Sequence, residues 1–287
     1  MSDRIDIRKT YKLYVGGGFA RSESGRSYLV SDAKGGFVAN AAQASRKDVR
    51  DAVVAARKAF PGWAGATAYQ RGQVMYRVAE VMEARRAQFL GEVCSAEGLA
   101  RKPADATVTE AIDRWVWYAG WADKLSQVFG NANPVAGPYF DFSVPEPTGV
   151  VGVLAPQRSS LLGLVSALAP VIVSGNTCVV VTSERHPVPA ITLGETLATS
   201  DVPAGVVNIL TGLTGELAPW LASHRDVNAI DLTGADPTHM TELQVAAADN
   251  LKRVLREESE PDWGQVPTTA RLRHYLETKT VWHTVGR

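Results

Sequence analysis

Gly149-Val-Val-Gly-Val-Leu154 is a short apolar run, and three comparable runs follow it along the chain. They are Thr177-Cys-Val-Val-Val181, Val206-Val-Asn-Ile-Leu210 and Asn228-Ala-Ile-Asp-Leu232. We predict helices between them, over residues 160–173, 189–199 and 215–223. Apolar strands that alternate with helices are typical of a parallel sheet covered on both faces. The sequence therefore predicts an α/β fold in which helices flank a parallel sheet.

The residues before this region are predicted to be mainly helical. Ser45 and Asp48 have the spacing of a capping box, and apolar positions from Val49 to Phe60 share one face of a helix that Pro61-Gly62 should end. Helical patterns recur over residues 69–93 and 104–125. Two segments are expected to be extended. Residues 11–19 should form a hairpin with residues 28–30, and residues 139–144 should belong to a protruding hairpin arm.

Ligands of an open parallel sheet bind at the carboxyl ends of its strands. In this chain those ends are the turns Ala155-Pro156, Thr182-Ser183, Thr211-Gly212 and Thr233-Gly234. None of these turns contains Gly-x-Gly-x-x-Gly or a P-loop, so the two general nucleotide-binding motifs do not identify a ligand.

Composition excludes several classes of function. The 287 residues include 30 Lys+Arg and 30 Asp+Glu, so the formal net charge is zero and neither a nucleic-acid nor a membrane partner is expected. Cys94 and Cys178 cannot form a disulfide framework, and we expect both to be small hydrophobic residues in a cytoplasmic protein. The five histidines, at positions 186, 224, 239, 274 and 283, lack metal-ligand spacing, so no metal is predicted.

Five segments, in this order and at these separations, together resemble the aldehyde dehydrogenase superfamily. They are Glu146–Pro156, Ala169–Thr177, Val202–Gly212, Leu232–Gly234 and Asn250–Val254. The resemblance covers about residues 10–257 and resumes near residue 271 with Leu276–Trp282. It implies a Rossmann-like dinucleotide domain, an oligomerisation hairpin, and a catalytic domain whose cysteine attacks the aldehyde before hydride passes to NAD or NADP.

By this resemblance, Glu257 stands at the position of the family's glutamate base, and the nucleophilic cysteine should follow it. No cysteine follows Glu257 in this sequence. We therefore expect the family's catalytic domain to be missing, with residues 258–270 as a linker in its place. Residues 1–125 and 149–257 would form the Rossmann-like domain, and residues 126–148 with 271–287 the oligomerisation hairpin and C-terminal strand. The chain resembles the shortened second module of tandem aldehyde dehydrogenases.

Positions that the family uses for catalysis and for the dinucleotide differ in this chain. Arg158 stands where the family has an oxyanion-stabilising asparagine, and Val181 replaces the lysine that holds the adenosine ribose together with the glutamate at Glu184. In the pyrophosphate turn, Asp236 adds a negative charge and His239 replaces a glycine. We therefore expect no catalytic residue and weak NAD(P) binding at most.

Other positions have a structural and a functional interpretation. Glu184, Gly212 and Gly234 are the remaining candidates for cofactor contact, although a glycine after a strand is equally what a tight turn requires. Glu257 belongs to the charged run 256–260, which is more typical of a solvated segment than of a relic base. The aromatic positions 115, 117, 118 and 121 are more typical of packing or a subunit contact than of a ligand surface.

These features predict a non-catalytic aldehyde dehydrogenase-like subunit that is the structural or regulatory partner of a full-length aldehyde dehydrogenase, or that associates with itself. One alternative is an NAD(P)-dependent aldehyde oxidoreductase that contributes to a composite active site with its partner. Another is a nucleotide-binding sensor without catalysis.

Overall fold

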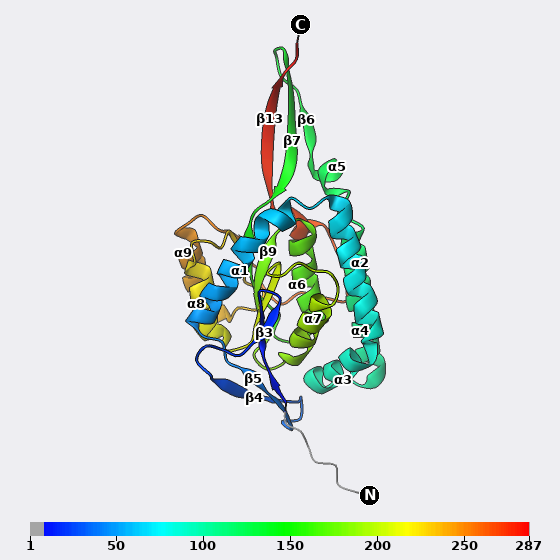
Figure 1. Ribbon diagram of the computed structural model, residues 1–287, viewed down its shortest axis with the longest axis vertical. Coiled ribbons are helices and arrows are strands. Elements are labelled where there is room, and N and C mark those ends of the chain that lie inside the picture. Colours follow the sequence, from blue (N-terminus) through cyan, green and yellow to red (C-terminus); the bar gives the residue numbers. More distant parts are fainter. Residues whose placement is uncertain (1–8, 287) are drawn as a thin grey trace, which may run out of the picture.

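A seven-stranded sheet forms the centre of the computed structural model, which describes residues 9–286 (Figure 1). The strand order is β12-β11-β8-β9-β10-β2-β3. The first five are parallel: β12 (Arg253–Leu255), β11 (Ala229–Asp231), β8 (Val150–Leu154), β9 (Thr177–Val181) and β10 (Val207–Leu210). The predicted parallel sheet is confirmed, and β12 is a strand that the sequence analysis missed.

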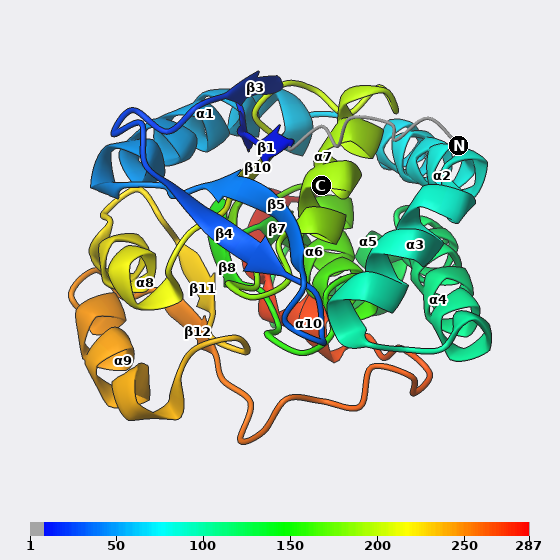
Figure 2. The same ribbon diagram turned by 90° about the horizontal axis from the view of Figure 1, so that it is seen from below.

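Side chains that alternate along the strands form two separate cores, one on each face of the sheet. On one face Val179 and Val181 pack with residues of α1 (Arg46–Ala64), α8 (Thr214–Ser223) and α9 (Met240–Ala248). On the other face Cys178 and Val180 pack with α6 (Leu162–Val173) and α7 (Val188–Ala198), and beyond these with α2 (Ala68–Ala84), α3 (Arg86–Glu97) and α4 (Arg101–Ala119). Figure 2 shows the two groups of helices on opposite sides of the strands.

Two helix predictions need correction. Pro61 does not end α1, which continues to Ala64. The last turn is held because the Gly65 N–H donates to the Pro61 carbonyl at 3.0 Å and the buried Trp63 indole donates to the Ile172 carbonyl at 2.8 Å. The pattern over 69–93 is not one helix, because the chain bends at Arg85, between α2 and α3.

The predicted hairpin between residues 11–19 and 28–30 is wrong. Gly16 and Gly17 have φ values of 60° and 82°, so the chain turns there and β2 (Leu13–Val15) pairs with β3 (Gly18–Ala20). These two strands extend the central sheet beyond β10. The segment around Tyr28 instead forms β4 (Ser27–Ser31), which pairs with β5 (Phe37–Ala42), and β1 (Thr10–Tyr11) completes this second sheet.

A three-stranded arm protrudes from one end of the molecule (Figure 1). It contains β6 (Asn131–Asn133), β7 (Tyr139–Pro147) and β13 (Leu276–Thr284), with β7 in the middle. The antiparallel register of β13 and β7 runs from Leu276↔Pro147 to Thr284↔Tyr139. The C-terminal strand thus completes the sheet of its own hairpin. Two short helices flank the arm, α5 (Leu125–Phe129) and α10 (Ala270–His274).

The aromatic residues of α4 are mostly interior. Trp115 and Tyr118 are buried, and Trp117 and Trp121 pack partly buried against the same core, as the packing interpretation predicts. Over residues 9–286, no helix is long and apolar enough to cross a membrane. The division of the chain into domains stays a prediction.

Candidate functional site

The turns predicted to bind ligands lie together at the carboxyl end of the parallel sheet. Leu154 pairs with Val181, and Val181 pairs with Leu210, so the turns after β8, β9 and β10 begin at the same level. Beside them, β11 pairs with β8 up to Asp231. The candidate residues Glu184, Gly212, Gly234 and Glu257 follow these strands and β12.

Glu184 has a structural partner in this site. Its carboxylate accepts a hydrogen bond from the Thr214 N–H, the first residue of α8, and its own N–H donates to Gln157 Oε1 at 3.1 Å. The residue that precedes α8, Leu213, provides no side-chain cap. Since the first N–H groups of a helix lack partners and carry partial positive charge, the carboxylate stabilises the start of α8.

Both candidate glycines have a geometric reason to be glycine. A Cβ on Gly234 would lie 1.9 Å from the Ala155 carbonyl oxygen, because the Gly234 N–H donates to the Leu154 carbonyl at 3.0 Å and holds the two turns together. Gly212 has a φ of 148°, which favours glycine, and a Cβ there would lie 3.1 Å from the Ala44 nitrogen. Close backbone packing therefore accounts for both positions without a ligand.

The turn that the resemblance predicts to be the family's pyrophosphate turn carries a negative charge at Asp236. Asp236 accepts hydrogen bonds from the Thr238 N–H at 2.8 Å and the Thr238 hydroxyl at 2.7 Å, and so begins the short helix Pro237–His239. These hydrogen bonds from Thr238 lower the pKa of Asp236, so the carboxylate is ionised at neutral pH. Val181, which the resemblance predicts to replace the family's ribose-binding lysine, is fully buried in the core.

Glu257 is held by an arginine. Arg271 Nη2 donates to Glu257 Oε1 at 3.1 Å and to Thr233 Oγ1 at 3.0 Å, and Arg271 Nη1 bonds to the buried carboxylate of Asp231. Burial favours the neutral form of Arg271, but the charges of Asp231 and Glu257 outweigh it and raise the pKa of the guanidinium. The Glu257 side chain is 34% exposed, so it is neither a free base nor part of a fully solvated run.

The residues between Glu257 and α10 are docked on the protein. Trp263 is buried, its ring lies 5.1 Å from the Arg271 guanidinium, and Arg114 Nη2 donates to its carbonyl at 2.7 Å. A Cβ on Gly163, in the first turn of α6, would lie 2.9 Å from Trp263 Nε1. The sequence analysis missed this contact, for which a lone tryptophan in a polar segment was the available signal.

Neither cysteine is placed as a nucleophile. Cys178 is fully buried in β9, and burial raises its thiol pKa further from neutrality. Cys94 is half-buried on α3 and packs against the core. Arg158 is exposed and forms no hydrogen bond or ion pair with the part of the chain that the structure describes, and within that part no group of three or more His, Cys, Asp or Glu could hold a metal.

The sequence profile of the aldehyde dehydrogenase family matches residues 19–259, which is most of the chain. The chain belongs to the aldehyde dehydrogenase family.

One relative in this family is aldehyde dehydrogenase family 2 member B4, mitochondrial, from Arabidopsis thaliana. It is 33% identical over 253 residues, which cover 86% of this chain and 46% of the relative. The chain thus spans about half the length of the curated aldehyde dehydrogenases that it matches.

Solved aldehyde dehydrogenases share the fold. HpcC from Thermus thermophilus superposes with a TM-score of 0.81 at 28% identity, over 86% of this chain and 47% of that protein. The NAD+ complex of aldehyde dehydrogenase from Bacillus cereus gives a TM-score of 0.80 at 24% identity, over 86% of this chain and 50% of that protein. The second likeness is one of fold alone.

The residues at the strand ends fit a dinucleotide poorly. The Ala155 carbonyl occupies the space beside Gly234, the Asp236 carboxylate is ionised, and the Glu184 carboxylate already binds the Thr214 N–H. A dianionic pyrophosphate would be repelled by Asp236, and a ribose would compete with α8 for Glu184.

Proposed function

We propose that this aldehyde dehydrogenase family protein is a non-catalytic subunit that supports a full-length aldehyde dehydrogenase or assembles with itself. The observation that carries the proposal is the ion pair between Glu257 and Arg271. The Arg271 guanidinium already occupies one oxygen of the Glu257 carboxylate, and the reaction also needs a positioned thiolate. Neither cysteine of the chain is placed to provide that thiolate, because Cys178 is fully buried and Cys94 packs against the core.

Weak NAD(P) binding is the second part of the proposal. It is supported by the Asp236 charge, the buried Val181 and the Glu184 contact with α8. We also propose that the protein is located in the reducing cytoplasm, where Cys94 and Cys178 would remain free thiols. NAD(P) added to the protein alone should give little heat in calorimetry.

The arm supports assembly. Along β7, Phe140 and Phe142 point to the same face, and their cross-strand partners on β13 are His283 and Val281. The two phenylalanine rings stack 5.3 Å apart, and Phe140 is 51% exposed. An exposed aromatic pair on a protruding sheet is typical of an interaction surface. The outer edge of β13 also has no strand partner within residues 9–286, so its backbone can pair with another chain.

Two measurements test the proposal. NADH formation from an aldehyde should be undetectable for the isolated protein, and light scattering should show self-association or a complex with a full-length aldehyde dehydrogenase from the same host. If the complex forms NADH faster than the full-length enzyme alone, and Glu257→Gln removes that gain, the composite active site replaces this proposal.

A further inference from the structure

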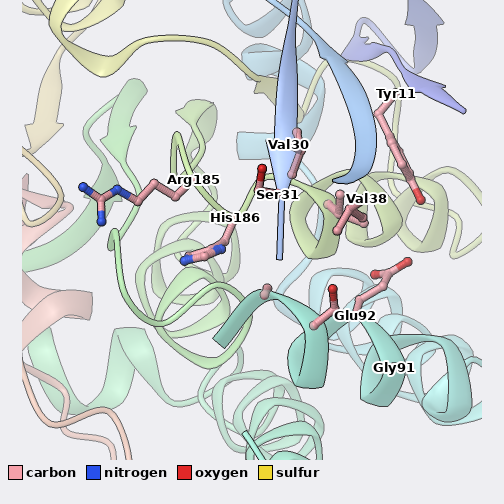
Figure 3. Close-up of a pocket in the computed structure, with 11 residues that line it drawn as sticks. Tyr11, Val30, Ser31, Val38, Gly91, Glu92, Arg185 and His186 are labelled. Carbon is pink, nitrogen blue, oxygen red and sulfur yellow. The ribbon is translucent and has the colours of Figure 1, made fainter. Parts of the chain in front are cut away.

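A cavity of about 200 Å³ lies between the second sheet, α3 and the loop that joins β9 to α7 (Figure 3). An apolar cavity of about 150 Å³ is enough to hold benzene, so this one has room for a ring-sized molecule. The rim includes Gly91 and Val38, which are both exposed, so solvent molecules can enter. Most of its lining is apolar, with Val30, Val38 and Val188 from three different elements.

Glu92 is the carboxylate in this apolar lining. Its Oε1 accepts hydrogen bonds from Thr192 Oγ1 at 2.7 Å and Gln88 Nε2 at 3.0 Å, which fix the orientation of the carboxyl group. Its Oε2 is buried and has no hydrogen-bond partner in the structure of residues 9–286. A buried polar atom without a partner is unusual in a native protein and calls for a ligand or ordered water.

Within residues 9–286, the basic side chains near the cavity form no ion pair with Glu92. Lys9 Nζ lies 4.1 Å from the centre of the Tyr11 ring and 3.5 Å from Glu195 Oε1. The Arg85 guanidinium bonds to Glu195 at 2.9 Å. The Arg185 side chain extends away from Glu92, as Figure 3 shows. Burial therefore raises the pKa of Glu92 to about 7, and the charge of Glu195 adds to this shift.

We propose that this cavity binds a small organic amine, whose ammonium group donates to Glu92 Oε2 and whose apolar body lies among Val30, Val38 and Val188. An ammonium group supplies both the missing hydrogen bond and a counter-charge. A metal ion suits the cavity less well, because Ca²⁺ takes six to eight oxygen ligands and the lining provides one carboxylate. The site does not depend on the proposed function, since it uses neither the arm nor Glu257.

The probe is benzylamine, which combines a ring with one ammonium group. Calorimetry at pH 8 should show saturable binding at one site, and the melting temperature should rise with benzylamine concentration because the ligand binds the folded state. Glu92→Gln should weaken binding at least about tenfold, the range expected for the loss of a charge-assisted hydrogen bond. Benzyl alcohol and benzoate should bind at least about tenfold more weakly than benzylamine to the wild-type protein.

Gly91 offers a matched pair of variants that block the site or leave it open. A Cβ at Gly91 would meet nothing within 4 Å, and the residue lies inside α3, so Gly91→Leu adds bulk at the rim without a backbone clash. Both Gly91→Leu and Gly91→Ala should raise the stability of α3. Only Gly91→Leu should abolish benzylamine binding.

The proposal fails if benzylamine does not saturate, which would mean that water alone fills the cavity. It also fails if benzyl alcohol or benzoate binds as tightly as benzylamine, or if Gly91→Leu leaves binding unchanged in a protein with a normal melting curve. NADH formation by the isolated protein, or a lack of assembly, would count against the proposed function but has no bearing on this site, so the two proposals can fail separately.

Discussion

Arg271 on α10 binds Glu257 in the loop after β12 and the buried Asp231 at the end of β11, and so joins the C-terminal segment to the sheet. The guanidinium side chain is only 11% exposed. Glu257, which the resemblance predicts at the family's base position, is therefore part of a charge network that also includes Tyr275, whose hydroxyl donates to Asp231 at 3.1 Å. In this chain Glu257 contributes to folding through that network.

We first predict that Arg271→Met destabilises the protein by about 3–5 kcal/mol, because Asp231 would be left as a buried charge without its cation. Glu257→Gln should cost less than about 1 kcal/mol, since the Glu257 side chain is partly exposed and solvent screens the pair. Urea unfolding followed by circular dichroism measures both values. Equal losses for the two variants would contradict the assignment of Asp231 as the main partner.

The second prediction separates the structural from the ligand-binding interpretation of Gly234. Gly234→Ala should destabilise the protein by about 1–3 kcal/mol or more, because the new Cβ would meet the Ala155 carbonyl oxygen and the turns must move apart. The control is Gly62→Ala in α1, where a Cβ meets nothing within 4 Å and a small gain in stability is expected. An unchanged melting temperature for Gly234→Ala would show that the packing interpretation is wrong.

The sequence was sufficient for the parallel sheet because its strands are continuous apolar runs, such as Thr177–Val181, whose side chains are buried on both faces. It was insufficient where tertiary contacts outweigh local signals. Pro61 ordinarily ends a helix, yet the buried Trp63 holds α1 together through Ala64. The short strand β12 has too few residues for a periodic pattern and exists because it pairs with β11.

In the candidate site, too, local sequence signals predicted positions but not tertiary contacts. The positions of Glu184, Gly212 and Gly234 at the strand ends could be predicted, since each follows a buried strand. Glu257 follows β12, the strand that the sequence analysis missed, and only the family resemblance singled it out. The partners of these residues could not be predicted, because Thr214, Ala155 and Arg271 come from distant segments. The same holds for Trp263, whose contacts with Gly163 and Arg114 have no sequence pattern.

The third prediction concerns pH. Burial raises the pKa of Glu92 from 4.5 to about 7, so between these values the folded protein holds a proton that the unfolded chain has lost. Stability therefore falls as the pH rises from about 4.5 to about 7, and the loss is complete above about 7. In Glu92→Gln this contribution is absent, and the difference in unfolding free energy between variant and wild type should change by on the order of 1–3 kcal/mol across that range.

The measurement is urea unfolding of both proteins at several pH values from 4.5 to 8. Lys9, Tyr11, His186 and Glu195 lie near Glu92 or line the same cavity and are present in both proteins, so their contributions to stability largely cancel in the difference. Parallel curves for the wild type and Glu92→Gln would mean that Glu92 ionises normally in the folded state.

The last prediction concerns the arm. Phe140→Asp places a charge on the face that Phe140 shares with Phe142, and should weaken self-association or partner binding at least about tenfold, because a buried unpaired carboxylate is costly in an interface. Tyr139→Asp is the matched control, since Tyr139 is adjacent in β7 and points to the opposite face, toward Trp282. Both changes lie on exposed positions, so circular dichroism melting curves should be nearly unchanged.

Light scattering over a concentration series, with the protein alone and with a full-length aldehyde dehydrogenase, gives the dissociation constants. If the wild type is strictly monomeric at high micromolar concentration and does not bind the full-length enzyme, assembly through the arm is excluded. If Phe140→Asp and Tyr139→Asp weaken association equally, the contact lies instead at the outer edge of β13, where a partner strand would be close to both faces of the sheet.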